Sequence, residues 1–167
     1  MRKAITILGT ILIAAMILTS GSAVATWYFA DHVEDYERCH NPDDAVGAPD
    51  YEYATLGVET PILRLGWIIL DLGSGNEMGL NQNFTVFASS TYPELYDVFV
   101  SENASWEYKE MFWVGQDYDT ANHDFTTPST PEKQWRYIGL EGKSGAVSPP
   151  QDPFYGPEID AVGWNDE

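Results

Sequence analysis

The side chains that could act as nucleophile or base are few and badly spaced for catalysis. His123 precedes Asp124, the types that form a base and its orienting carboxylate, and Ser89 precedes Ser90, which carry hydroxyl nucleophiles. Adjacent residues on a strand or turn generally point apart, so neither pair forms a natural dyad. Neither lies in a motif with the turn and spacing that catalysis requires, and the chain has no glycine-rich phosphate loop. The sequence therefore predicts that the protein is not an enzyme.

Soft metal ligands are also few. His32, Cys39 and His40 could be drawn as ligands, but their spacing fits no standard zinc pattern. Cys39 is the only cysteine, so it can form no internal disulfide, and no lipid-attachment or haem-attachment pattern surrounds it. The ordinary interpretation of Cys39 is a small, half-buried thiol.

Charge limits the partners. The chain has 167 residues, with 8 Lys and Arg and 26 Asp and Glu. Arg2 and Lys3 are the only charged residues among the first 25, so the remainder carries a net charge of −20. Phosphate binding needs a basic surface, which argues against a nucleic acid partner. An acidic exterior indicates solubility in salty surroundings, colloidal repulsion or binding of divalent cations.

Residues 1–25 have the pattern of a signal peptide, in which a basic start is followed by an apolar run and by small residues. Two alternatives stay open. A retained membrane anchor results if residues 27–29 extend the apolar stretch to the roughly 20 residues that a span needs. A filament helix results if residues 3–6, which resemble the processing site of archaeal pilin-like proteins, are cleaved. All three interpretations place residues 26–167, predicted to be one domain, in the extracellular space or at the cell surface.

Beyond residue 25 the sequence predicts an all-β fold. Short apolar runs alternate with turn signals, and no stretch has the period of a helix. The run Gly66–Gly73 is nearly continuous, as is typical of a strand buried on both faces, and Ser74–Asn76 supplies a turn. The predicted strands are Gly66–Gly73, Asn83–Ala88, Leu95–Ser101, Glu110–Gly115, Gln134–Leu140 and Glu158–Trp164. Many short strands with turn-rich connections imply a β-sandwich or jelly roll.

The order of these segments resembles the discoidin or galactose-binding-like family. A loop at Asn41–Asp50, of the pattern Asn-Pro-x-x-Ala-x-Gly-x-Pro-Asp, precedes a strand like Trp67–Leu72, and the chain ends on a strand like Glu158–Val162. The resemblance extends from about Ala30 to Gly163. It implies a discoidin-like jelly roll whose early loop meets its last strand, and a binding module of secreted cell-surface proteins.

The resemblance also implies a structural calcium site where the early loop meets the last strand. Calcium takes about 6 to 8 oxygen ligands. The residues in matching places are Asp43 or Asp44, Ala45 through its carbonyl, Asp50, Thr55 through either oxygen, Glu158, and Ala161 through its carbonyl. The alternative is a hydrogen-bonded clasp or a solvated face without metal. In both cases we expect Asp160, on the same strand face as Glu158, to hold the early loop.

Sugar binding is the use that this fold most often implies, through loop aromatics that stack on pyranose rings. The aromatic residues in predicted loops or turns are Tyr51, Tyr53, Tyr92, Trp106, Tyr108, Tyr118, Phe154 and Tyr155. Such side chains also act as lids on the edge of a core. Two sequons, at Asn83 and Asn103, would make an exported chain a glycoprotein, and Asn103, in a turn, is the better acceptor.

We therefore predict a secreted or surface-held, non-catalytic module that binds a carbohydrate or another cell-surface component, with calcium at its chain ends. The alternative is a structural surface protein, either a pilin-like filament subunit or a membrane-anchored envelope protein. In that alternative residues 5–29 stay as a helix and pack against other copies. Contact with a membrane is expected only through this N-terminal segment.

Overall fold

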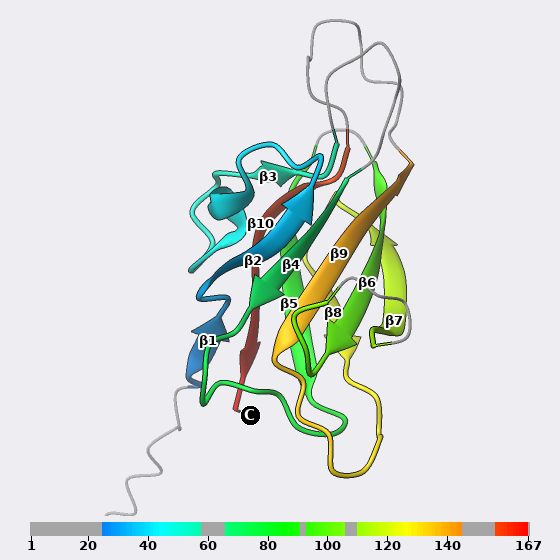
Figure 1. Ribbon diagram of the computed structural model, residues 1–167. Coiled ribbons are helices and arrows are strands. Elements are labelled where there is room, and N and C mark those ends of the chain that lie inside the picture. Colours follow the sequence, from blue (N-terminus) through cyan, green and yellow to red (C-terminus); the bar gives the residue numbers. More distant parts are fainter. Residues whose placement is uncertain (1–24, 58–65, 91–92, 106–109, 145–155, 167) are drawn as a thin grey trace, which may run out of the picture.

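The computed structural model describes residues 25–57, 66–90, 93–105, 110–144 and 156–166. They form a sandwich of two antiparallel β-sheets (Figure 1). The first sheet, called sheet A, has the strand order β1 (Trp27–Phe29), β10 (Glu158–Asn165), β5 (Asn83–Ala88) and β8 (His123–Thr126), with β3 (Ala54–Thr55) also paired to β10. Sheet B has the order β2 (His32–Glu37), β4 (Trp67–Asp71), β9 (Tyr137–Ser144), β6 (Leu95–Ser101) and β7 (Phe112–Tyr118). The all-β sandwich predicted from the sequence is confirmed.

The core lies between the sheets and follows the alternation of each strand. In β5, Phe84 and Val86 are almost completely buried in the core, so Thr85 and Phe87 face outward. The largest fully buried side chains include Trp135, Tyr96 and Phe84. No helix among the described residues is long and apolar enough to cross a membrane.

Four of the six predicted strands are confirmed almost to the residue as β4, β5, β6 and β10. The other two are displaced toward the C-terminus. The predicted strand Gln134–Leu140 begins only at Tyr137, because Trp135 forms an isolated bridge with Met78 before the strand starts. The predicted strand Glu110–Gly115 is β7, which runs on to Tyr118 because it pairs along β6 as far as Leu95.

Strand β1 corrects one expectation about the N-terminal segment. Residues 27–29 form a strand on the edge of β10, with Tyr28 opposite Trp164, so the helix of the filament or anchor alternatives cannot extend to Phe29. The amide of Thr26 donates to the Asp166 carboxylate at 2.9 Å, which extends this pairing by one residue. Residues 1–24 of the predicted signal peptide or helix, which spans residues 1–25, lie outside the described residues.

The chain crosses from sheet A to sheet B within two residues. The Ala30 amide donates to the Val162 carbonyl of β10 at 2.9 Å, and the next amide, of Asp31, donates to the Asp71 carbonyl of β4 at 2.7 Å. The 3₁₀ helix η1 (Pro42–Ala45) follows β2 and lies against β10 and β3. The early loop therefore meets the last strand, as the resemblance implies (Figure 1).

Candidate functional site

An aromatic cluster covers part of the outer face of sheet A. It consists of Trp27 and Phe29 from β1 and Phe87 from β5, and we call it the aromatic platform. Trp27 stacks on Phe29 with ring centroids 5.7 Å apart and meets Phe87 edge-on at 5.5 Å. Phe29 and Phe87 are 5.9 Å apart. Trp27 keeps 40% of its surface exposed, so the platform is open to solvent.

Small residues on β10 make room for the aromatic platform. Gly163 is paired with Phe29, and a Cβ atom added to Gly163 would lie only 2.6 Å from Cδ1 of the Phe29 ring. Ala161 is paired with Phe87 and is completely buried although it lies outside the core cluster. The rings therefore lie directly over the backbone of β10.

Four polar residues, Asn83, Thr85, Asp124 and Thr126, lie beside the aromatic platform, and we call them the polar wall. The Thr85 hydroxyl donates to Asp124 Oδ1 at 2.6 Å, and the Thr126 hydroxyl donates to Asn83 Oδ1 at 2.8 Å. Asp124 is exposed, and a carboxylate offers about four acceptor positions, so it can accept further hydrogen bonds.

The aromatic platform and the polar wall enclose a shallow pocket of about 400 Å³. Its lining residues are Trp27, Asn83, Phe84, Thr85, Phe87, Asp124, Trp164 and Asn165. Aromatic faces beside a few convergent carboxylate, hydroxyl and amide groups are the usual composition of a small-molecule site. This composition suits a ligand with one apolar face and a rim of hydroxyl groups.

Among the described residues, none of the aromatic side chains predicted as ligand contacts lines this pocket. Tyr51 is 80% exposed in the loop before β3, Tyr53 is half-buried nearby, and Tyr118 is 48% exposed at the end of β7. The other predicted contacts lie outside the described residues: Tyr92, Trp106, Tyr108, Phe154 and Tyr155. Trp27 and Phe87 escaped the sequence analysis because Trp27 was considered only as an extension of the apolar N-terminal stretch and Phe87 only as part of a predicted strand.

The two sequon asparagines occupy different surroundings. Asn103 is exposed in the turn after β6, where its amide donates to the Ser101 hydroxyl at 3.1 Å. Asn83 opens β5 and lines the pocket. A glycan on Asn83 would occupy the pocket, whereas a glycan on Asn103 would not, and both modifications stay predictions.

The early loop and the last strand are joined by a clasp of hydrogen bonds. The buried Asp160 carboxylate accepts the Asp50 amide at 2.9 Å and the Tyr51 amide at 3.3 Å. The expectation that Asp160 holds the early loop is thus confirmed. Strand β3 completes the clasp, since Thr55 pairs with Glu158.

The residues of the implied calcium site lie around this clasp, but their donor atoms are partly engaged. The Thr55 carbonyl already accepts amide hydrogens from His40 and Gly57, both at 2.9 Å. Ala45 and Ala161 are fully buried, and Asp43 is exposed on η1 while Asp44 is half-buried. Among the described residues, the carboxylates of Asp43, Asp44, Asp50 and Glu158 do not gather into a group of three that could hold an ion. The donor set fits a hydrogen-bonded clasp better than a calcium cage, and the calcium site stays a prediction.

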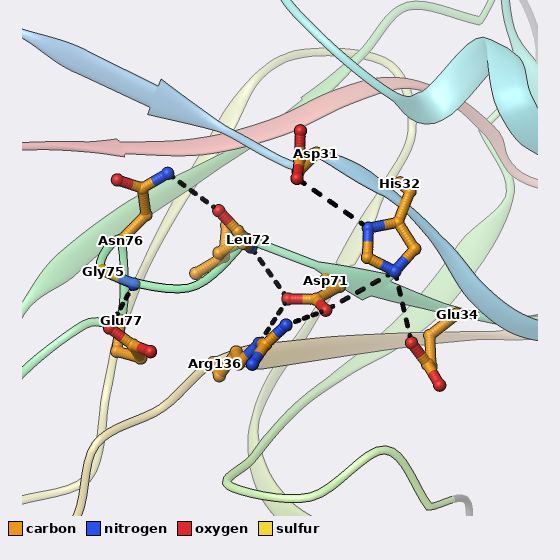
Figure 2. Close-up of polar contacts among 10 residues, drawn as sticks. Asp31, His32, Glu34, Asp71, Leu72, Gly75, Asn76, Glu77 and Arg136 are labelled. Atoms are coloured by element: carbon orange, nitrogen blue, oxygen red, sulfur yellow. Dashed lines mark hydrogen bonds and ion pairs between the residues drawn. The ribbon is translucent and has the colours of Figure 1, made fainter.

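A second polar cluster lies where β2 meets β4 (Figure 2). Arg136 holds the buried Asp71 carboxylate in a bidentate pair, with both N···O distances 2.7 Å, and the Gly73 amide donates to Asp71 Oδ1 at 2.8 Å. Burial alone would raise the pKa of Asp71, but these hydrogen bonds and the Arg136 charge hold it below its ordinary value. From β2, His32 Nε2 lies 3.5 Å from Asp71 Oδ2 and 3.3 Å from Glu34 Oε2.

The other reactive side chains are engaged separately. His123 Nδ1 pairs with Asp117 Oδ2 at 2.5 Å, while Asp124 pairs with Thr85, so the two neighbours do point apart as expected. Cys39 is half-buried, and burial, followed by the Asp44 charge, raises the pKa of its thiol to about 12. The described residues do not bring Cys39 and His40 into a metal-binding group with His32.

Comparison with known proteins identifies the fold. No family model matches the chain, and no curated protein matches it. Chitosan-binding module 2 of a chitosanase/glucanase from Paenibacillus sp. IK-5, solved with chitotriose, superposes with a TM-score of 0.56 and 16% identity over 82% of this chain and 98% of that one. The CBM32 of AlyQ, solved with 4,5-unsaturated mannuronic acid, gives a TM-score of 0.53 and 14% identity over 83% and 97% of the two chains. The predicted discoidin-like jelly roll is therefore confirmed as the fold of this chain.

Proposed function

We propose that this chain is a non-catalytic carbohydrate-binding module and that the sugar lies on the outer face of sheet A. The two structures of similar fold described above are modules named for, or solved with, carbohydrate ligands. The observation that carries the proposal is the pocket itself, in which the aromatic platform stands beside the Thr85–Asp124 pair.

The chemistry of the pocket matches a pyranose ring. The Trp27 ring has an exposed apolar surface on which the C–H face of a sugar can stack. Asp124, Asn83 and Thr85 lie at the side, where the equatorial hydroxyls of a stacked ring would point, and can exchange hydrogen bonds with them. Apolar stacking and lateral hydrogen bonds would then act on the same ligand.

The pocket has the groups for binding but not for glycoside cleavage. Hydrolysis of a glycosidic bond ordinarily needs two carboxyl groups on either side of the bond, about 5 to 9.5 Å apart. Among the described residues that line the pocket, Asp124 is the single carboxylate. This composition favours a binding module over a glycosidase.

Affinity electrophoresis of the full chain through gels that contain soluble polysaccharides tests the proposal. We expect at least one polysaccharide to retard the protein, and Trp27→Ala to weaken binding about tenfold or more because it removes the exposed ring. Trp113→Ala is the matched control, since Trp113 is 60% exposed on β7 of the other sheet. Retardation that survives Trp27→Ala but is lost in Trp113→Ala would reject the site.

We further propose that the module acts outside the cytoplasm, with residues 1–25 as its export or anchoring segment and residues 26–167 as one domain. Strand β1 supports this division, because the folded domain begins within two residues of residue 25. The net charge of −20 beyond residue 25 suits an exported, soluble surface.

A further inference from the structure

We propose that His32, Glu34 and Asp71 bind one divalent transition-metal ion of the zinc type. His32 Nε2 lies 3.3 Å from Glu34 Oε2 and 3.5 Å from Asp71 Oδ2, and the three ligand atoms all lie within 4.8 Å of one another (Figure 2). Ligand atoms about 2.0–2.2 Å from a tetrahedral zinc ion are separated by roughly 3.3–3.6 Å. The two spacings from His32 Nε2 thus match those of a zinc site with a fourth position for water, and the third spacing, between the Glu34 and Asp71 oxygens, is at most 4.8 Å.

Direct hydrogen bonding explains this arrangement less well. Nε2 carries at most one hydrogen, yet it faces two carboxylate oxygens, and charge-assisted N–H···O bonds are about 2.7–2.9 Å long. Both contacts of His32 exceed that length. A shared cation would bond all three atoms at once, with Asp71 Oδ2 also accepting the hydrogen bond from Arg136 at 2.7 Å.

The surroundings of each ligand support the same assignment. Arg136 and the Gly73 amide fix the orientation of Asp71 through three hydrogen bonds, and Asp31 Oδ2 lies 4.0 Å from the other ring nitrogen of His32. Such outer partners orient metal ligands. The register of β2 against β4 shifts between Val33 and Asp35, which marks a bulge at Glu34. Bulges re-aim side chains beside functional sites.

The donor set selects the class of ion. One imidazole nitrogen and two carboxylates suit zinc or a neighbouring transition metal, whereas calcium and magnesium prefer oxygen donors alone. The imidazole also distinguishes this cluster from the many other acidic surfaces of the chain. A bound ion would tie the edge strand β2 to β4 at the point where the chain enters sheet B.

Zinc titration of the full chain against a chromophoric chelator tests the site. We expect one tight zinc ion per chain, and an affinity at least tenfold lower in His32→Ala and in Glu34→Gln. Both side chains are exposed, so these variants should keep the fold and the melting temperature without metal. His123→Ala and Glu37→Gln are matched controls, because His123 also pairs with a carboxylate and Glu37 lies on the same strand.

Cobalt(II) gives a second readout. We expect the visible absorption of a four-coordinate site in the wild type and in both controls, and its loss in His32→Ala. Three results would each overturn the proposal: no stoichiometric zinc, zinc binding unchanged in His32→Ala, or equal competition by calcium, which would indicate diffuse attraction to the acidic surface.

Discussion

At the scale of single residues, the buried carboxylate of Asp71 forms a bidentate pair with Arg136. Asp71 is 1% exposed on β4, and its carboxylate is held by three hydrogen bonds. Removing either member of such a pair is destabilising, because the group that remains keeps its desolvation penalty but loses its hydrogen-bond partner. The pair therefore joins β4 to the start of β9. It also fixes the end of β4 that pairs with His32 of β2.

Asp71→Asn should lower the free energy of unfolding at neutral pH by about 1–3 kcal/mol, because it removes the ionic acceptor of Arg136. The pKa of Asp71 is lowered in the folded state, so its contribution is complete above the unfolded value of about 3.9 and is lost as the pH falls through the folded pKa. The difference between wild type and variant should therefore shrink on acidification. Urea denaturation from neutral to acidic pH, with a metal chelator present, measures this difference.

The control for this experiment is Asp35→Asn, since Asp35 is exposed on β2. It should change stability by less than about 0.5 kcal/mol at every pH. A deficit in Asp71→Asn that stays constant or grows toward acid would show that the ionised pair is not the source of the effect.

At the scale of elements, the candidate site depends on the position of the short strand β1. It contributes two of the three platform rings, and it is held on the edge of β10 by three register pairs and by the stacking of Tyr28 on Trp164 at 4.7 Å. The Trp164 indole in turn donates to the Asn76 carbonyl at 2.9 Å. The position of the platform therefore depends on how closely β1 packs on β10.

Gly163→Ala should displace β1 and damage the pocket. The added Cβ would meet Phe29 Cδ1 at 2.6 Å and the Tyr28 carbonyl at 3.0 Å, and the second contact is with backbone, which cannot rotate away. We expect a loss of stability of about 1–3 kcal/mol and weaker retardation by polysaccharide. Gly79→Ala is the control, since its added Cβ would meet nothing within 4 Å. Unchanged sugar binding in a destabilised Gly163→Ala variant would show that β1 is not part of the binding site.

The strands themselves were predictable where aromatic and β-branched residues are concentrated. Strands β5 and β6 were identified by this composition, and the structure buries every second residue of β5 and the last four residues of β6. Strand β2 escaped because it is an edge strand with five exposed side chains and one half-buried, Val33. Strand β8 escaped because Phe125 is its single buried residue. An edge strand pairs with a neighbouring strand on one side only, so more of its side chains are exposed and its sequence need not be apolar.

At the scale of the whole molecule, the early loop meets the last strand, β10, on one side of the sandwich (Figure 1). The sequence anticipated this meeting through the early loop and Asp160, because a resemblance carries information on long-range order that local pattern lacks. It did not locate the candidate pocket, because the pocket is formed by strands far apart in the sequence, with Trp27 near the start of residues 26–167 and Asp124 about two-thirds of the way along them. Whether the side chains of Trp27 and Phe29 face the core or solvent depends on the pairing of β1 with β10, which the local sequence does not specify.

Mapping the ligand by NMR tests the central claim most directly. A polysaccharide fragment that retards the protein would be titrated into the isotopically labelled full chain, kept in mild detergent, while backbone amides and indole N–H groups are followed. The proposed site predicts that the perturbed signals cluster on β1, β5 and β8, with the Trp27 indole and the amides of Thr85 and Asp124 among the largest changes. Perturbations confined to the loop of Tyr51 or to Tyr118, with the Trp27 indole unmoved, would contradict the account and place the ligand on the loops instead.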